Sequence, residues 1–258
     1  MAREWFGLMT QAEILAVTIT KGEDKIAMGF LQKMILGFVG GAMISLGYLA
    51  YIRVIASVTE LGSLANLIGA AVFPIGLIVI VLAGGELITG NMMAVSAALF
   101  ARKISLKQLL HNWLVITIAN FIGAMFVAYC FGHLVGLTSS AEYLHKTLAV
   151  AEAKTSATAL QAFISGIGCN WFVGLAVWLA YGAKDAAGKI LAIWFPVMTF
   201  VAIGFQHSVA NMFVIPAAIF EGGSSWLAFI NNVIPVYCGN VVGGAVFVSL
   251  IYFYGLKK

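Results

Sequence analysis

Long apolar segments fill most of the chain, and charged residues fall almost entirely between them. Seven windows contain no Asp, Glu, Lys or Arg: 34–52, 61–85, 87–101, 108–141, 155–183, 190–220 and 222–256. A helix needs about 20 residues to cross a bilayer, so the window 87–101 is too short alone. We join it to 61–85 as one helix that is interrupted at Glu86. The pattern therefore predicts six membrane helices.

The two halves of the chain repeat each other. Three pairs of segments correspond: 84–93 with 204–213, 119–124 with 239–244, and, more loosely, 31–37 with 160–166. The first two pairs are 120 positions apart and the third is 129 apart, which we interpret as nine extra residues in the central connection. Three helices per half force the halves into opposite orientations, and polar interruptions in such repeats are typical of transport pathways.

These patterns predict the architecture of the chain. We expect an all-α membrane protein made of two inverted three-helix repeats, with the broken second and fifth helices facing each other near the centre. Residues 1–258 form a single channel domain without a separate soluble part. Its expected sections are an N-terminal cytoplasmic segment 1–30 with an interfacial helix over 10–30, a first repeat 31–136, an outer connection 137–157 and a second repeat 158–256.

Composition supports a membrane location, since 62% of the residues are hydrophobic and only 9% are charged. Lysine and arginine are retained on the cytoplasmic side of membranes. Placing the N-terminus inside puts eleven of them, including Arg3, Lys257 and Lys258, on that side. We therefore expect a multi-pass protein of the cell membrane with both termini cytoplasmic. The net charge of +4 then reflects topology and contact with lipid headgroups, and no nucleic-acid partner is expected.

His207 is the only histidine deep within a predicted span, and Gln206 and Ser208 flank it at the interruption of the fifth helix. An ionisable side chain inside a membrane is costly and usually functional, which favours a role in permeation. The alternative is a neutral histidine that hydrogen-bonds neighbouring helices together.

Two polar residues occupy the interruption of the opposite half. The Thr89 hydroxyl can donate or accept, so it can pair with either tautomer of the histidine. Alternatively, it satisfies a backbone carbonyl that the break leaves free. Glu86 either acts in permeation or caps the half-helix that follows it, where the helix dipole favours negative charge. We favour capping.

Asparagines recur at matching places in the halves, where broken helices expose backbone groups that need partners inside lipid. They are Asn91, Asn120, Asn170, Asn211 and Asn240, and we expect most of them to be structural. Asn170, Asn211 and Asn240, together with Gln206, are also expected to be pore residues that contact the solute. Lys154 lies just before the fourth helix on the outer side. Arg53 and Lys146 are the other two basic residues expected on that side. A cation at a pore mouth draws anions inward, although a solvated loop lysine fits the same position.

Four segments resemble the formate/nitrite transporter family: 85–91, 112–113, 169–171 and, most specifically, Gly204-Phe205-Gln206-His207-Ser208-Val209-Ala210-Asn211-Met212. The resemblance covers essentially the whole chain. It implies an aquaporin-like fold and a homopentamer in which each protomer holds its own pore. It also implies that His207 is the central pore histidine and Thr89 its partner. Asn170 and Lys154 correspond to the fourth-helix and vestibule residues.

The resemblance further implies two apolar constrictions. Phe73, Leu77 and Phe200 match one, and Ile88 and Val173 match the other. Ile88 stands where some members have phenylalanine, so the second ring is expected to be wider or less rigid in this chain.

Gln206 is a second departure, because many members carry glutamate immediately before the histidine. Without that carboxylate, His207 is expected to be neutral more often. In the family mechanism an anion enters a positive vestibule, gains a proton and passes the dry ring as the neutral acid. The cost of moving a bare carboxylate into low dielectric makes this protonation physically reasonable. Whether His207 supplies the proton or only hydrogen-bonds the solute stays open at the level of sequence.

We expect a bidirectional, proton-coupled channel for small monovalent anions of weak acids, in which the central pore histidine assists protonation, with formate first and nitrite or hydrosulfide as alternatives within the family. A water or glycerol channel would also have duplicated half-helices. However, Asn91-Met92 and Asn211-Met212 lack the Asn-Pro-Ala motif of such channels, and no arginine follows the second copy.

An enzyme or haem protein would need paired catalytic or axial groups within the spans, and the spans hold one deep histidine. We expect no enzymatic activity, cofactor or metal, and we expect the protein to contact a small anionic substrate and membrane lipid.

Overall fold

The structure is a computed structural model that describes residues 8–256. Arg3, Lys257 and Lys258, which the orientation argument includes, lie outside the described residues. In chain order the helices are α1 Gln11–Ala27, α2 Phe30–Ala56, η1 Thr59–Leu61, α3 Ser63–Val72, α4 Ile75–Ala83, α5 Ile88–Phe100, α6 Leu106–Phe126, η2 Val127–Leu134, α7 Ala141–Thr155, α8 Ala159–Gly182, α9 Ala186–Ile203, α10 Ser208–Phe220, α11 Trp226–Val241, η3 Val242–Leu250 and α12 Ile251–Leu256. No β-strand occurs in residues 8–256.

Six of these helical stretches are long and apolar enough to cross a membrane, as predicted. They are Phe30–Ala56, Ser63–Ala83, Leu106–Leu134, Ala159–Gly182, Ala186–Ile203 and Trp226–Leu256. The short helices α5 and α10 continue the second and fifth spans beyond a break. The prediction of six membrane helices with a broken second and fifth is therefore confirmed.

Both breaks begin at a glycine with a left-handed backbone. Gly84 has φ 105° and Gly204 has φ 90°, and these two residues are repeat counterparts. L-residues with a Cβ rarely adopt such angles, so a glycine ends each first half-helix at little steric cost. The chain then runs extended through Leu87 and His207, which are the N-caps of α5 and α10. Each break thereby aims the N-terminus of a short helix at the interior.

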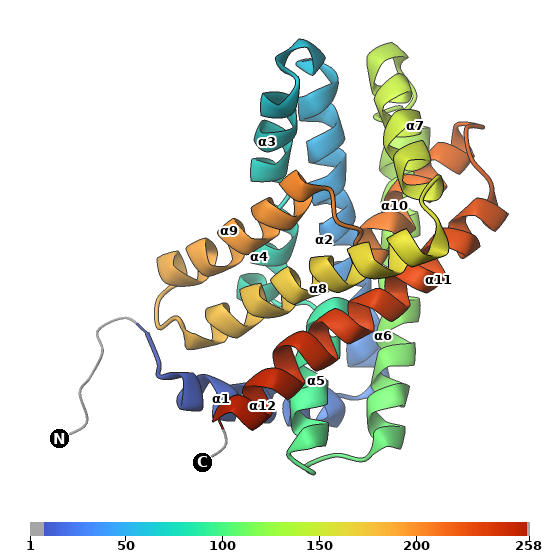
Figure 1. Cartoon of the computed structure of the whole chain (residues 1–258). Helices are drawn as coiled ribbons and strands as arrows, with labels where there is room; N and C mark the ends of the chain where they lie inside the picture. Colours follow the sequence, from blue (N-terminus) through green and yellow to red (C-terminus); the bar gives the residue numbers. More distant parts are fainter. Residues whose placement is uncertain (1–7, 257–258) are drawn as a thin grey trace.

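The repeat is longer than the sequence comparison indicated. The Asn112 side chain donates to the Lys25 carbonyl at 3.2 Å, and Asn232 donates to the Lys154 carbonyl at 2.6 Å. Lys25 lies on α1 and Lys154 on α7, so these helices are counterparts, and they lie at opposite ends of the molecule (Figure 1). Lys25 and Lys154 are 129 positions apart, so this offset already holds before the matched segments 31–37 and 160–166 begin.

The interpretation of nine extra residues in the central connection is therefore wrong. Those residues lie within the first repeat, between α2 and α5, where the chain forms η1 and a longer second span. Each repeat consists of an amphipathic helix, a full span, a broken span and a closing span.

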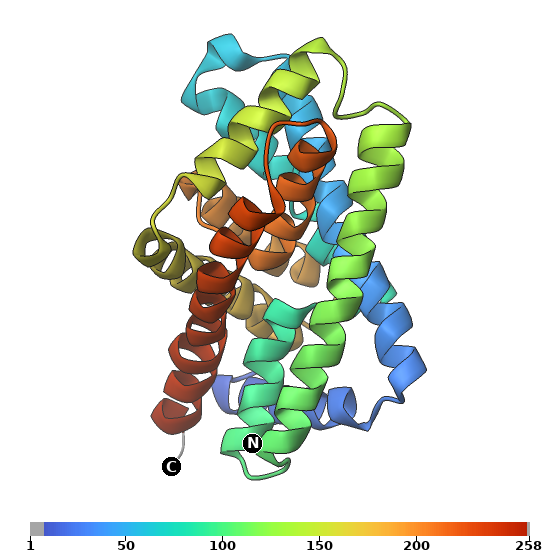
Figure 2. The same ribbon diagram turned by 90° about the vertical axis from the view of Figure 1, so that its right-hand side faces the viewer.

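The full spans pack in two equivalent pairs, α2 with α6 and α8 with α11 (Figures 1 and 2). Glycines allow these helices to approach closely. A Cβ on Gly41 would lie 1.9 Å from the Asn120 carbonyl oxygen, and one on Gly239 would lie 2.0 Å from that of Phe163. Small residues at such crossings are typical of membrane helix packing. The two pairs enclose the broken helices, which carry the candidate site.

Candidate permeation site

His207 and Thr89 meet at the centre, one from each break. The His207 Nδ1 atom accepts a hydrogen bond from the Ala210 backbone N–H at 3.2 Å and so caps α10. Because Nδ1 accepts, the ring hydrogen must lie on Nε2. Nε2 is 2.9 Å from Thr89 Oγ1, and Nε2–H therefore donates to that hydroxyl. The hydroxyl keeps its own hydrogen for another acceptor.

Two aromatic rings pack beside this pair. Phe200 stacks on His207 with a centroid separation of 6.1 Å and an interplanar angle of 20°. Phe73 meets Phe200 edge to face at 5.9 Å. Both phenylalanines are only 2% exposed. The structure thus brings two of the three residues predicted for the first constriction into direct contact.

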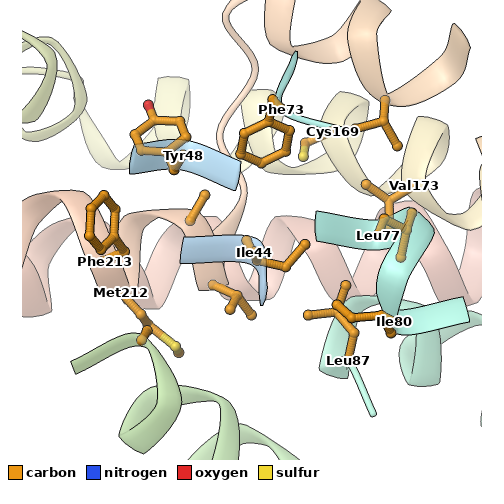
Figure 3. Close-up of a cluster of buried hydrophobic side chains, with 14 of the residues drawn as sticks. Ile44, Tyr48, Phe73, Leu77, Ile80, Leu87, Cys169, Val173, Met212 and Phe213 are labelled. Atoms are coloured by element: carbon orange, nitrogen blue, oxygen red, sulfur yellow. The ribbon is translucent and has the colours of Figure 1, made fainter. Parts of the chain in front are cut away.

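The remaining constriction residues are Leu77, Ile88 and Val173, all of which are buried. Leu77 follows Phe73 by about one helical turn and faces Val173 of α8 (Figure 3). Ile88 and Val173 are 0% and 2% exposed and line neither of the two cavities described below. Phe73, Leu77 and Val173 form part of one continuous buried cluster (Figure 3). Apolar side chains therefore surround the polar pair.

A cavity opens on each side of this apolar region. The larger, the α7 vestibule, has a volume of about 540 Å³, and its lining includes Lys146, Lys154, Phe73, Phe200 and His207. The smaller, the α1 vestibule, has a volume of about 210 Å³, and its lining includes Lys25, Leu77, Glu86, Leu87 and Tyr181. The two cavities share no lining residue. His207 lines the larger cavity, and Leu87, its counterpart at the offset of 120, lines the smaller one.

Two asparagines hold the breaks in place. The Asn120 side chain accepts from the Ile88 backbone N–H at 2.8 Å and donates to the Gly37 and Glu86 carbonyls. Asn240 does the same in the second half, accepting from Ser208 at 2.9 Å and donating to the Gly166 and Gln206 carbonyls. These bonds satisfy backbone groups that lipid could not satisfy. The structural role expected for both asparagines agrees with their contacts.

A second pair of asparagines holds Glu86 and Gln206, the polar residues inside the breaks. Asn91 donates to Glu86 Oε2 at 2.8 Å and to Asn112 Oδ1 at 3.0 Å. In the second half, Asn211 donates to Gln206 Oε1 at 2.9 Å and to Asn232 Oδ1 at 2.7 Å. Sequence reasoning missed the roles of Asn112 and Asn232, although their spacing of 120 positions was a usable signal.

The expectation that Glu86 caps α5 is wrong. The N-cap of α5 is Leu87, which makes no side-chain capping bond. Glu86 instead accepts a 2.6 Å ion-pair hydrogen bond from Lys25 of α1. Burial opposes the charged ammonium, but Glu86, with smaller contributions from Tyr181 and Asp24, outweighs it and raises the pKa of Lys25. Sequence reasoning missed Lys25, which the offset of 129 from Lys154 could have identified.

Lys154 is the counterpart of Lys25 and lies in the wall of the larger cavity. Its ammonium donates to the Gly204 carbonyl at 3.3 Å, at the start of the second break. Burial in this wall lowers the pKa of Lys154 to about 8. Within residues 8–256, no carboxylate lies at ion-pair distance from it.

Asn170 lies behind the site rather than in a cavity wall. Its side chain donates to the Thr89 carbonyl at 3.2 Å and to the Asn240 carbonyl at 2.7 Å. It lines neither vestibule, and its counterpart at the offset of 129 is Gly41, so it does not recur in the first half. Asn170 thus ties the two breaks to each other.

Two further residues of the α7 vestibule were missed. Tyr51 donates to Asn66 Oδ1 at 2.7 Å, and Asn66 donates to the Ala202 carbonyl at 3.0 Å. Ala202 lies in the last turn of α9, where carbonyls lack helical partners. The pair secures the turn that carries Phe200. No motif or repeat marked these positions in the sequence.

Comparison with known proteins identifies the family. The model of the family described as formate/nitrite transporter matches residues 12–254. The chain is 62% identical to the uncharacterized transporter YrhG of Bacillus subtilis (strain 168), over 95% of this chain and 93% of that protein. It is 55% identical to the formate channel BtFdhC of Bacillus thuringiensis, over 95% of each chain.

Solved structures agree with these matches. A pentameric formate channel with formate bound superimposes with a TM-score of 0.78 at 30% identity, over 89% of this chain and 98% of that chain. With six apolar spans, two inverted repeats and a family match over nearly its whole length, the chain is a multi-pass membrane protein that belongs to the formate/nitrite transporter family.

Proposed function

We propose that the protein is a channel for small monovalent anions of weak acids, with formate as the preferred solute. The single observation that carries this proposal is the polar pair His207–Thr89, buried within apolar side chains between two vestibules. The site offers hydrogen bonds to one small polar solute and no compensating charge within the narrow region. The names of the relatives BtFdhC and the pentameric formate channel support formate.

The solute crosses the narrow region as the neutral acid. Lys154 and Lys146 concentrate the anion in the α7 vestibule. A bare carboxylate would lose its hydration against Phe73 and Phe200 without a counter-charge, which is a prohibitive cost. The carboxylate therefore gains one proton before the ring, and the acid releases it on the far side. Each turnover moves one anion together with one proton.

His207 acts as a hydrogen-bond donor and not as the source of the proton. Its only ring hydrogen lies on Nε2, and giving it away would leave an imidazolate anion in an apolar interior. Protonating Nδ1 instead would remove the acceptor that caps α10. The proton consequently comes from hydronium in the aqueous vestibule, which becomes water as the carboxylate becomes the acid, while Nε2–H and the Thr89 hydroxyl bind the oxygens of the passing acid. This arrangement serves the neutral solute without creating a charge.

Assembly and orientation belong to the same proposal. We place both termini in the cytoplasm, so that α1 faces inward and α7 outward, because most lysines and arginines then lie inside. A homopentamer with one pathway per protomer is supported by the pentameric relative. Each chain holds both vestibules and both breaks, so each pathway is complete within one protomer.

The test is uptake of labelled formate by proteoliposomes at pH 7.5 and pH 6 outside, with nitrite, hydrosulfide and glycerol as competitors. Saturable uptake that is faster at the lower pH and inhibited by small weak acids supports the proposal. Stronger inhibition by nitrite or hydrosulfide than by unlabelled formate would reassign the preferred anion within the family. Permeation of glycerol or water with no formate uptake would contradict the proposal and indicate an aquaporin-like channel.

A further inference from the structure

The two vestibules are built from counterpart residues but carry different charge. The charged residues that line the α7 vestibule are Lys146 and Lys154, both positive. Those that line the α1 vestibule are Lys25 and Glu86, which cancel. Lys25 corresponds to Lys154 at the offset of 129, and Glu86 corresponds to Gln206 at the offset of 120. The exchange of glutamate for glutamine accounts for one unit of this charge difference, and Lys146, whose counterpart at the offset of 129 is Val17, accounts for the other.

The ion pair in the α1 vestibule is close and shielded from water. Lys25 Nζ lies 2.6 Å from Glu86 Oε1, and the two side chains are 13% and 4% exposed. Asn91 binds the second carboxylate oxygen, so the carboxylate is fixed in place. A charge and its counter-charge at this separation present a dipole to the cavity, and the field of a dipole falls off faster than that of a lone charge.

In the α7 vestibule the same position holds a neutral amide. Gln206 Oε1 accepts from Asn211 at 2.9 Å and from Asn232 at 2.8 Å, as Glu86 does from Asn91. Lys154 donates to the Gly204 carbonyl and meets no carboxylate within ion-pair distance in the described part of the chain. Its charge is therefore uncompensated and faces the cavity.

We propose that Glu86 makes the channel sided: by neutralising Lys25 it weakens anion binding in the α1 vestibule, while the uncompensated Lys154 binds anions in the α7 vestibule. This inference rests on the proposed anion-channel function. The half-saturation concentration for formate is lower for entry from the α7 face than from the α1 face. Because the pathway is passive, the ratio of maximal rate to half-saturation concentration must be equal in both directions without a driving force. Entry from the α1 face therefore saturates later and reaches a higher maximal rate.

The experiment measures formate flux in both directions. Initial rates of labelled formate entry are determined over a concentration series in intact cells and in inverted membrane vesicles, both without a pH gradient. Two variants change one vestibule each: Glu86→Gln frees the charge of Lys25, and Gln206→Glu gives Lys154 a carboxylate. Gln206 shows that an amide fits the position of Glu86, because it takes the same kind of asparagine partners. Glu23→Gln on α1 removes the same charge outside the cavity lining and serves as the control.

We expect Glu86→Gln to lower the half-saturation concentration for entry from the α1 face about fivefold, the factor for one unit charge acting at about 4 Å in water, without changing the value for the α7 face. Gln206→Glu raises the half-saturation concentration for entry from the α7 face by a similar factor, and Glu23→Gln changes neither value. Equal half-saturation from both faces, unaffected by Glu86→Gln or Gln206→Glu, would overturn the inference while leaving the channel function intact. Absence of saturable formate flux in the wild-type protein from either face would instead overturn the proposed function.

Discussion

The two ring nitrogens of His207 have different tasks, and this decides what the side chain can do for a solute. Nδ1 accepts from the Ala210 N–H and holds the start of α10, while Nε2–H points to Thr89. The same ring cannot give up its hydrogen or take a second one without losing one of these contacts. At this scale, the site is a fixed donor whose capping bond favours the neutral form.

Replacing His207 separates the two tasks. His207→Phe loses both the cap and the donor. We therefore expect the formate flux to be lost together with its pH dependence, and the missing cap to cost about 1 kcal/mol of stability. His207→Asn keeps a capping oxygen and a donor amide, so stability and part of the flux should remain. Proteoliposome uptake and thermal unfolding of the purified pentamer measure the two effects. Wild-type flux and pH dependence in the phenylalanine variant would remove His207 from the mechanism.

Lys154 titrates within an accessible pH range, because burial lowers its pKa to about 8. The ammonium is charged below that pH and neutral above it. Anion affinity from the α7 face should therefore fall as pH rises from 7 to 9. We expect the half-saturation concentration to rise several-fold over this interval.

Lys154→Arg provides the control for this titration, since arginine keeps its charge at every pH used. The protonation of formate itself is the same for both proteins at each pH. The ratio of their half-saturation concentrations therefore reports only the charge of Lys154. The measurement is the half-saturation concentration for uptake from the α7 face. Identical pH profiles for the wild-type protein and Lys154→Arg would contradict the assignment of this charge to the vestibule.

The two breaks show what a sequence can reveal about an element. The polar interruptions, their duplication and the six spans could be predicted, because apolar length and matching residues are visible in one dimension. Glu86 could not be assigned correctly, since its partner Lys25 lies 61 positions earlier on a helix whose packing no local pattern encodes. Tyr51 and Asn66 were missed for the same reason. Asn170 was grouped with the recurring asparagines although it has no counterpart in the first half, and its contact with the Thr89 carbonyl required coordinates.

The positive φ angle of Gly204 allows the second break to be tested by substitution. Gly204 has φ 90°, and an added Cβ there would meet nothing within 4 Å, so Gly204→Ala introduces backbone strain without a clash. That strain costs roughly 1–2 kcal/mol. We expect a lower Tm and reduced formate flux, because the loop that positions His207 must shift.

Gly255→Ala is the matched control for this strain. Its added Cβ also meets nothing within 4 Å, but Gly255 lies in α12 and has no positive φ. Alanine favours a helix over glycine by up to about 1 kcal/mol, so Tm should stay or rise. Equal Tm changes in the two variants would show that the left-handed angle at Gly204 is not needed for the break.

At the scale of the whole molecule, two opposed copies of one scaffold enclose a single pathway. Equivalent asparagines hold both breaks, and equivalent lysines lie at both mouths. The copies differ where the chemistry occurs. His207 corresponds to Leu87, so only one half supplies the imidazole, and Gln206 corresponds to Glu86, so only one half carries the carboxylate. The shared scaffold positions the pathway, and these differences make its two faces unequal.

Exchanging the two residues should therefore remove the sidedness of the channel. In Glu86→Gln/Gln206→Glu the carboxylate faces Lys154 and Lys25 carries a free charge, while Lys146 remains in the α7 vestibule, so each vestibule holds one net positive charge and the total charge is unchanged. We expect the half-saturation concentrations for formate from the two faces to converge. His207 gains a neighbouring carboxylate, so the pH profile of flux is also expected to change. Flux measured in cells and inverted vesicles provides the comparison. Because net charge is conserved, an effect of overall charge predicts that the difference between the two faces persists, whereas a field set within each vestibule requires that difference to shrink.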